Sequence, residues 1–213
     1  MVQPAEPILV PFCNLELEVR EGIVLAGGSE VRIRAVSPRD EDGLREMLSR
    51  LSHETIRERF HLPMPRVPEW ALAYLTDMDH HDRESLVALV GDEIVGQAMY
   101  ARQEASEAEM AIVVEDRWQS REIGRLLLIC LAEEAVHRKI EVFTGTVLGE
   151  NRGALKFFSS VLPKARFKIR EGVYHLYVPL PDPEPRCNLK PSGAPEEEKP
   201  GKRQNKRTTS WKH

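Results

Sequence analysis

The chain has 213 residues, of which 41% are hydrophobic, and a formal net charge of −4. This apolar content is enough for one core, so a single globular domain with tails is expected. The longest apolar run, residues 126–132, is far shorter than the roughly 20 residues of a membrane-spanning helix. The first eleven residues place no basic segment before their short apolar run, which argues against a secretory signal and predicts a cytoplasmic protein.

Residues 1–30 are predicted to be an N-terminal extension. The alternating segment 15–19 (LELEV) is followed by Gly27 and Gly28, which indicates a short strand or hairpin leading into the domain.

From Val31 the pattern becomes regular and predicts an α/β fold over residues 31–180. Val31, Ile33 and Ala35 alternate with polar residues as in a half-buried strand, and a helix follows from Pro38 to about residue 51. Ser52 is a predicted N-cap for a second helix over residues 53–60, and Pro68 opens a third over residues 69–76.

The second half of the domain reads as a meander followed by a βαβ unit. Strands are expected at 85–90, 93–102 and 107–114, then a helix from 123 to about 139 and a strand at 141–148. A last helix over 151–160 precedes a hairpin within 165–180 that turns near residues 171–172. The resulting expectation is a mixed central sheet of about seven strands with about four helices.

Residues 181–213 are predicted to be a disordered tail. Seven of the 15 prolines lie between Pro179 and Pro200, and few aliphatic side chains remain to offset the entropy of ordering. The last thirteen residues carry five Lys or Arg and no acid, which leaves about −9 on the rest of the chain. Because the domain is acidic, a solubilising role for this basic end is favoured over nucleic-acid binding.

The three cysteines, Cys13, Cys130 and Cys187, lie far apart and form no C-x-x-C pair, so no zinc or redox site is expected. Cys130 falls within an apolar helical stripe, where a packing role is favoured over that of a nucleophile.

The junction between residue 114 and the helix starting near Ile123 is the most informative segment. A strand, loop and helix in this order direct several backbone N–H groups and the positive helix end at one point, which suits a pyrophosphate. Arg117, Arg121 and Arg125 are placed to add charge-assisted contacts. Taken alone this signal is weak, since arginines at helix starts are usually solvated.

The whole span resembles the Gcn5-related N-acetyltransferase (GNAT) family. Gln119 and Gly124 match the family's coenzyme loop, Gln/Arg-x-x-Gly-x-Gly/Ala, after a strand. Upstream, residues 31–34 (VRIR) and 51–60 (LSHETIRERF) resemble the opening of bacterial protein lysine acetyltransferases of this family. Downstream, Asn151 leads a helix of the pattern N-x-x-A-x-x-F-F. The resemblance covers about 150 residues.

This resemblance implies an acetyl-CoA-dependent N-acetyltransferase acting on an amine, a protein lysine in the first instance and a small amine in the second. It also implies a splayed strand pair at the coenzyme site. The implied coenzyme-binding residues are Ile112, Val113, Val114, Gln119, Ser120, Arg121, Glu122, Ile123, Gly124, Arg125, Asn151 and Phe158. The alternative is a non-catalytic GNAT domain that serves as a coenzyme A sensor or regulatory partner.

Acetyl transfer requires a base, since a lysine amine with a pKa of about 10.4 must lose a proton before it attacks the thioester. In the family a glutamate on the strand before the loop has this role, and Glu109 is its counterpart here. The alternative is that Glu107 and Glu109 simply face outward from an alternating strand. Backbone N–H groups around residues 112–114 are implied as donors to the thioester oxygen.

The chain departs from the family pattern at three positions. Ser120 and Glu122 stand where glycines are common, and a carboxylate at Glu122 adds bulk and like charge beside a pyrophosphate. We therefore expect weakened but not abolished coenzyme binding, unless Glu122 points to solvent. Phe158 occupies the place of a tyrosine that acts as general acid in many members; Tyr174 or Tyr177 are substitutes, although both fit packing roles in the hairpin.

Potential metal ligands gather in only one segment, where Asp77, Asp79, His80, His81 and Asp82 precede a strand. A solvated loop is favoured there, because adjacent residues rarely converge on one ion without a scaffold. The acceptor's identity depends on residues 59–82, whose chemistry the sequence does not specify, and the oligomeric state is likewise undetermined.

Overall fold

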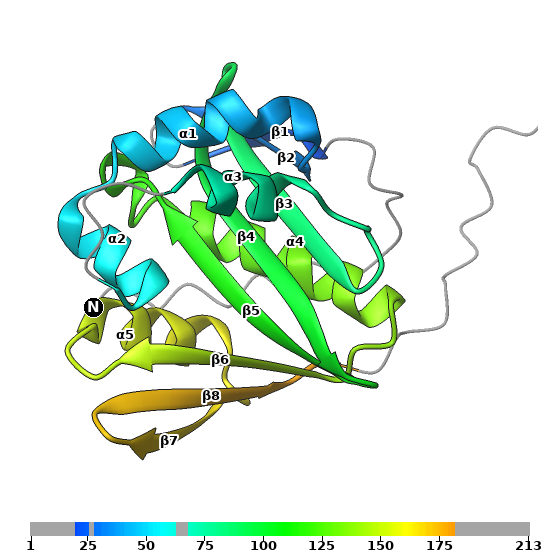
Figure 1. Ribbon diagram of the computed structural model, residues 1–213, viewed down its shortest axis with the longest axis vertical. Helices are drawn as coiled ribbons and strands as arrows, with labels where there is room; N and C mark the ends of the chain where they lie inside the picture. Colours follow the sequence, from blue (N-terminus) through cyan, green and yellow to red (C-terminus); the bar gives the residue numbers. More distant parts are fainter. Residues whose placement is uncertain (1–19, 26–27, 63–67, 182–213) are drawn as a thin grey trace, which may run out of the picture.

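The computed structural model describes residues 20–25, 28–62 and 68–181 (Figure 1). The strand expected at residues 15–19 and nearly all of the predicted tail lie outside these ranges. Within them, the elements follow the predicted order of strand, helices, meander, βαβ unit, helix and hairpin.

One mixed sheet of eight strands forms the centre of the described part of the chain, in the order β1-β2-β3-β4-β5-β6-β8-β7. The strands are β1 (Arg20–Val24), β2 (Glu30–Ala35), β3 (Arg83–Val90), β4 (Glu93–Glu104), β5 (Glu107–Val114), β6 (Val142–Leu148), β7 (Arg166–Arg170) and β8 (Val173–Pro179). About seven strands were expected, and the additional one is β1. All neighbours are antiparallel except β5 and β6, which are parallel.

Five α-helices are present in the described residues, one more than expected. They are α1 (Glu41–Ser49), α2 (His53–Phe60), α3 (Glu69–Thr76), α4 (Ile123–His137) and α5 (Arg152–Val161), with 3-10 turns at η1 (Pro38–Asp40) and η2 (Asp116–Trp118). Ser52 is confirmed as the N-cap of α2, since its hydroxyl accepts the backbone N–H of Thr55. Pro68 is the N-cap of α3 and not its first helical residue. None of the helices in these ranges has the length and apolar character of a membrane span.

Two hydrophobic clusters cover the two faces of the sheet. Strand β3 shows the division, because Leu86 and Ala88 pack on the side of α4 while Val87 and Leu89 pack on the side of α1 and α3. Cys130 is buried within the cluster formed around α4, in agreement with a packing role. In Figure 1, α1, α2 and α3 lie in front of the sheet and α4 lies behind it.

The sheet opens between β5 and β6. Only three pairs join these strands, Glu107 with Val142, Ala108 with Phe143 and Glu109 with Thr144. Beyond them β5 stays paired with β4 as far as Val114, and β6 stays paired with β8 as far as Leu148. Each strand therefore keeps one partner while the two separate, and a wedge opens between them (Figure 1).

The start of α5 is anchored at the far end of this wedge. The backbone N–H of Gly149 donates to the carbonyl of Gly172 in the β7–β8 turn at 2.8 Å. Asn151 then caps α5, because its side-chain oxygen accepts the backbone N–H of Ala154 at 2.7 Å. These two contacts position α5 beside β6.

Gly149→Ala is expected to destabilise the fold, because a Cβ at this position would lie 2.6 Å from the Gly172 carbonyl oxygen. Overpacking of this kind costs about 1–3 kcal/mol in the free energy of unfolding, measured by urea denaturation. The matched control is Gly153→Ala in α5, where the new Cβ would meet only the Asn151 side chain at 3.6 Å. Alanine favours a helix, so this change should be neutral or stabilising by up to about 1 kcal/mol. Equal effects of the two substitutions would contradict this account.

Candidate active site

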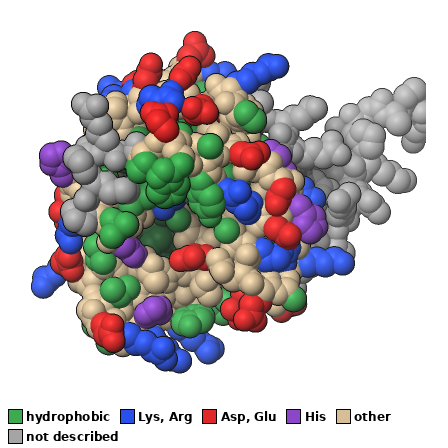
Figure 2. Space-filling view, viewed as in Figure 1, with side chains coloured by type: hydrophobic (Ala, Val, Ile, Leu, Met, Phe, Trp, Pro, Cys, Tyr) green, Lys and Arg blue, Asp and Glu red, His purple; other side chains and the backbone are tan. Residues whose placement is uncertain are grey.

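A cleft of about 940 Å³ occupies the wedge between β5 and β6. It is bounded by the end of α2, the separated parts of both strands, the loop before α4 and the first turns of α5. Figure 2 shows a hollow on the face of the molecule that carries α2, with apolar, acidic, basic and histidine side chains around it. A volume of this size accommodates a cofactor-sized ligand.

Most of the residues predicted from the sequence line this cleft. They are Glu109, Ile112, Val113, Val114, Gln119, Ser120, Glu122, Gly124, Arg125, Asn151 and Phe158. Two predicted residues do not line it. The side chain of Ile123 is fully buried in the core, and the exposed Arg121 lies over the ring of Trp118 at 5.1 Å. At Ile123 only the backbone is left to face a ligand.

The loop before α4 adopts left-handed backbone at two non-glycine positions. Ser120 has φ of +58° and Glu122 has φ of +67°, and these are the two positions where the family resemblance leads one to expect glycine. Glycine is favoured there because a side chain makes left-handed backbone costly. The Glu122 side chain is largely exposed, with a carboxylate oxygen 3.7 Å from a guanidinium nitrogen of Arg125.

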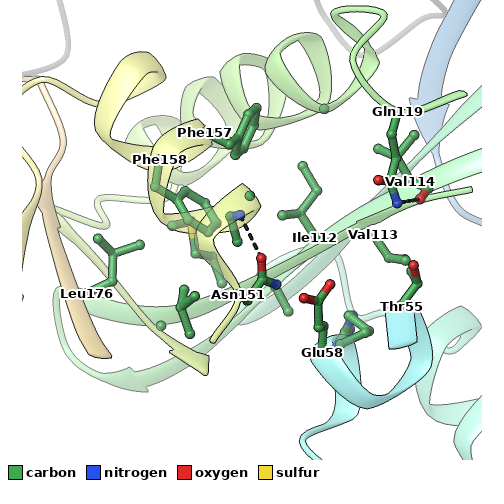
Figure 3. A pocket seen from close by; sticks show the side chains of 18 of the residues that line it. Thr55, Glu58, Ile112, Val113, Val114, Gln119, Asn151, Phe157, Phe158 and Leu176 are labelled. Atoms are coloured by element: carbon green, nitrogen blue, oxygen red, sulfur yellow. Dashed lines mark hydrogen bonds between the residues drawn. The ribbon is translucent and has the colours of Figure 1, made fainter. Parts of the chain in front are cut away.

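Gln119 folds back onto the end of β5. Its side-chain nitrogen donates to the carbonyl of Val114 at 3.1 Å (Figure 3). This contact ties the loop to the strand end and occupies a carbonyl that β6 no longer approaches.

Arg117, Arg121 and Arg125, the three arginines between the end of β5 and the first turn of α4, have different surroundings. Arg117 forms ion pairs with Glu93 and Glu115, each at 2.5 Å, so it is committed to carboxylates and not available to a phosphate as the sequence suggested. Arg125 is the one of the three whose side chain lines the cleft.

Asp116 links the loop before α4 to helix α2. Its carboxylate accepts the backbone N–H of Ser52 at 3.0 Å and the hydroxyls of Ser52 and Thr55 at 2.7 and 2.9 Å. Partial burial alone would raise the pKa of Asp116, but these donated hydrogen bonds lower it below its ordinary value. The carboxylate form is therefore the one that holds the loop against the start of α2.

A second carboxylate, Glu58, projects from α2 into the cleft (Figure 3). Burial raises its pKa, and the nearby carboxylates of Glu54, Asp116 and Glu150 add to the effect, while Arg57 opposes it. Sequence reasoning missed Glu58; the available signal was helical spacing, which places it on the same face of α2 as Thr55.

Glu109 lies at the apex of the wedge, in the last residue pair between β5 and β6. It is exposed and lines the cleft. Because side chains alternate along a strand, Glu109 shares a face with Ala111 and Val113. Both of these pack with the cluster under α1, α2 and α3, so the carboxylate points to the side on which α2 ends.

His61 follows α2 and reaches across the cleft. Its ring Nδ1 lies 3.5 Å from the hydroxyl of Thr146 on β6. Burial and the neighbouring Arg59 lower the pKa of His61, although Glu109 opposes this, so the neutral ring is favoured at pH 7. Neither Arg59 nor His61 was singled out from the sequence as a site residue.

The tyrosine hydroxyls considered as general acids lie elsewhere. Phe158 is buried and packs edge-on against Phe157 at 5.2 Å between ring centroids. Tyr174 packs on Phe167 in the hairpin, and Tyr177 is exposed on β8. Within the described residues, no tyrosine lines the cleft.

The segment rich in potential metal ligands forms a hydrogen-bonded turn. One carboxylate oxygen of Asp79 accepts the backbone N–H groups of His81, Asp82 and Arg83 at 2.8–2.9 Å. Over the described ranges, no three His, Cys, Asp or Glu side chains gather in an arrangement suited to a metal ion.

Comparisons with known proteins agree with this geometry. A family model described as the acetyltransferase (GNAT) family matches residues 45–161. The crystal structure of the GNAT domain of S. lividans PAT is 30% identical, with a TM-score of 0.71, over 75% of this chain and 97% of that domain.

Two more distant structures share the fold. The yncA putative acetyltransferase from Salmonella typhimurium, solved with its cofactor acetyl-CoA, is 16% identical with a TM-score of 0.58, covering 74% of this chain and 98% of that one. A cAMP-binding acyltransferase from Mycobacterium smegmatis is 24% identical with a TM-score of 0.54 over 76% of this chain. The match spans about half of the mycobacterial protein, 48% of its length.

Asp116→Asn is expected to loosen the connection between the loop and α2. The amide loses the charge that strengthens three hydrogen bonds, at a cost of about 1 kcal/mol in unfolding free energy, since the site is exposed and solvent weakens the contact. The pKa of Asp116 is lower in the folded protein than its ordinary value of about 3.9. The carboxylate therefore stabilises the fold above that ordinary value, and this stabilisation is lost as the pH falls through the lower pKa of the folded protein.

Urea denaturation of wild type and variant between pH 3 and pH 7 measures this difference. Asp92→Asn is the control, since Asp92 is exposed in the β3–β4 turn and its side chain forms an ion pair with Arg32 alone among the described residues, at 3.2 Å. A stability gap between Asp116→Asn and wild type that stays constant down to pH 3 would argue against the assigned role of the carboxylate.

Proposed function

Because the chain belongs to the acetyltransferase (GNAT) family, we propose that it transfers an acetyl group from acetyl-CoA to an amine, with a protein lysine as the acceptor and small amines as the second class. The observation that carries the proposal is the opening between β5 and β6. It places a carboxylate, Glu109, at the apex of a cleft whose other end is a loop at a helix N-terminus.

The coenzyme's pyrophosphate would lie against the loop from Ser120 to Arg125. Backbone N–H groups at the start of α4 and the helix dipole attract an anion there, and Arg125 adds a positive side chain within the cleft. The pantetheine arm would run along the edge of β5 that β6 leaves unpaired, with Asn151 at the start of α5 on the opposite wall. Ile112, Val113 and Val114 form this edge.

Glu109 would act as the general base. Its carboxylate accepts a proton from the acceptor ammonium, and the amine nitrogen then bonds to the thioester carbonyl carbon. The carbon–sulfur bond breaks, and the departing coenzyme A thiolate takes up the second proton that the nitrogen loses, so that the products are the amide and the coenzyme A thiol. Backbone N–H groups of residues 112–114 would stabilise the charge that develops on the carbonyl oxygen. A thiol pKa near 8.5 makes the thiolate a good leaving group, so Phe158 in place of a tyrosine is compatible with turnover.

A second candidate function is a coenzyme-binding domain without transferase activity. Two observations favour it, the carboxylate of Glu122 at the phosphate loop and the apolar Phe158 where an acid is common. This candidate predicts saturable acetyl-CoA binding without acetyl transfer to any amine.

Glu109→Gln is expected to lower the rate of acetyl transfer at saturating acetyl-CoA by about 10²–10⁴-fold, the range for loss of a general base. The rate is measured with a lysine peptide acceptor by mass spectrometry. Glu107→Gln is the matched control, since Glu107 lies two residues earlier on the same strand face and outside the cleft. A larger loss in Glu58→Gln than in Glu109→Gln would assign the base to α2 and refute the role of Glu109.

Glu122→Gly is expected to tighten coenzyme A binding about two- to fivefold, because it removes a like charge of modest, solvent-screened strength beside the phosphate site. Calorimetric titration with coenzyme A measures the dissociation constant. Ser120→Gly relieves left-handed backbone without a change of charge, and Glu122→Gln removes the charge alone, so the pair separates the two effects. Unchanged affinity in Glu122→Gly would show that this carboxylate does not weaken binding.

A further inference from the structure

Arg59 is a positively charged side chain in the cleft that no carboxylate of the described residues neutralises. It lies in the last turn of α2 and is half-buried. Its guanidinium donates to the sulfur of Met99 at 3.4 Å and lies 5.0 Å from the centre of the Phe60 ring. A thioether is a weak acceptor, so most of its donor capacity remains unused by these contacts.

Other arginines around the cleft are placed differently. On the same helix, Arg57 pairs with Glu54 at 2.8 Å and with Glu150 at 2.6 Å. Arg50, just before α2, pairs with Glu115 at 2.9 Å. Of the arginines that line the cleft, Arg152 is exposed and Arg125 lies 3.7 Å from Glu122. Within the described residues, Arg59 is therefore the cleft arginine that is partly buried without an ion pair.

Burial of an unpaired cation is unfavourable and requires compensation. Desolvation lowers the pKa of Arg59 to about 10, although Tyr74 and Glu109 partly offset this. At neutral pH the group is therefore still charged. A ligand that supplied an anion would recover part of the desolvation penalty, and a guanidinium holds a carboxylate through two parallel hydrogen bonds.

The position of Arg59 indicates which ligand would supply this anion. Its contact Met99 lies opposite Ala111 in the β4–β5 ladder, and Ala111 shares a strand face with Glu109. The phosphate loop begins beyond Val114, which is three residues or roughly 10 Å further along β5 from Ala111. Arg59 therefore accompanies the base at the acceptor end of the cleft and not the coenzyme's phosphates.

We propose that Arg59 binds a carboxylate carried by the acceptor, so that the preferred acceptors present an acidic group next to the amine that is acetylated. The proposal rests on the acetyltransferase function proposed above and specifies its substrate class. The amine would meet the Glu109 carboxylate while the acidic group of the same acceptor meets the Arg59 guanidinium. The opposite charges of these two side chains would thus orient the acceptor, because each attracts one end of it.

The carboxylate has two sources that share this chemistry, an Asp or Glu side chain beside a lysine in a protein, or the α-carboxylate of an amino acid. Blocked peptide amides in which lysine is flanked by Asp or by Asn test the first source. Nα-acetyl-lysine and its amide test the second. In both comparisons the amine stays the same and only the acidic group changes.

Acetylation of these probes by the full chain at saturating acetyl-CoA is expected to favour the acidic member of one pair about 10- to 100-fold in kcat/KM, as a charge-assisted contact implies. Arg59→Gln should abolish the preference, whereas Arg59→Lys should keep part of it. The control is Arg45→Gln, which removes an arginine of α1 whose partners Glu41 and Glu69 lie outside the cleft, and it should leave the preference unchanged.

A binding measurement separates this proposal from the proposed function. Calorimetric titration of the coenzyme A-saturated chain with the Asp and Asn peptides needs no turnover. Tighter binding of an acidic probe that Arg59→Gln abolishes supports the carboxylate site, even if no acceptor is acetylated and the transferase function fails. Equal binding of acidic and neutral probes overturns the inference. A change in Arg59→Gln confined to the choice between succinyl-CoA and acetyl-CoA also overturns it, since the anion would then belong to the acyl donor.

Discussion

The separation of β5 from β6 beyond Glu109 and Thr144 is the constraint on which the rest of the site depends. It is sustained because each strand keeps a full partner on its other edge, β4 for β5 and β8 for β6. The separation leaves one short edge of β5 and one short edge of β6 without a neighbouring strand. The backbone N–H and C=O groups of these edges need other partners. An extended ligand that carries amide groups would satisfy these edges, as a strand does in β-augmentation.

Both ends of the wedge are tied to elements distant in sequence. Asp116 connects the loop before α4 to the start of α2, and the contact of Gly149 with Gly172 anchors the approach to α5. Helix α2 thus reaches over β5 from a fixed origin, and its last turn places Arg59 on the same side as Glu109. The proximity of Arg59 to Glu109 is a consequence of this docking and not of any local motif.

Sequence periodicity predicted the order of the elements, and the junction after residue 114 predicted much of the cleft lining. Helical spacing places Glu58 on the same face of α2 as Thr55, but it does not show that this face, or His61 after it, lines the cleft. That depends on the packing of α2 against a strand about 50 residues later. The commitment of Arg117 to Glu93 was hidden for the same reason, since the partner lies in another strand. The left-handed backbone at Glu122 is not indicated by its own residue type. The one indication is the family resemblance, in which glycine is common at this position.

The most direct test of the account is an acetyl-CoA titration of the ¹⁵N-labelled chain followed by amide NMR. We predict saturable shifts concentrated in three segments, residues 110–114 of β5, residues 120–125 before and into α4, and residues 151–154 at the start of α5. Strands β1, β2 and β7, which lie away from the wedge, should change little. Saturable binding with shifts outside these segments, or no binding at millimolar acetyl-CoA, would contradict the claim that the wedge between β5 and β6 is a coenzyme site.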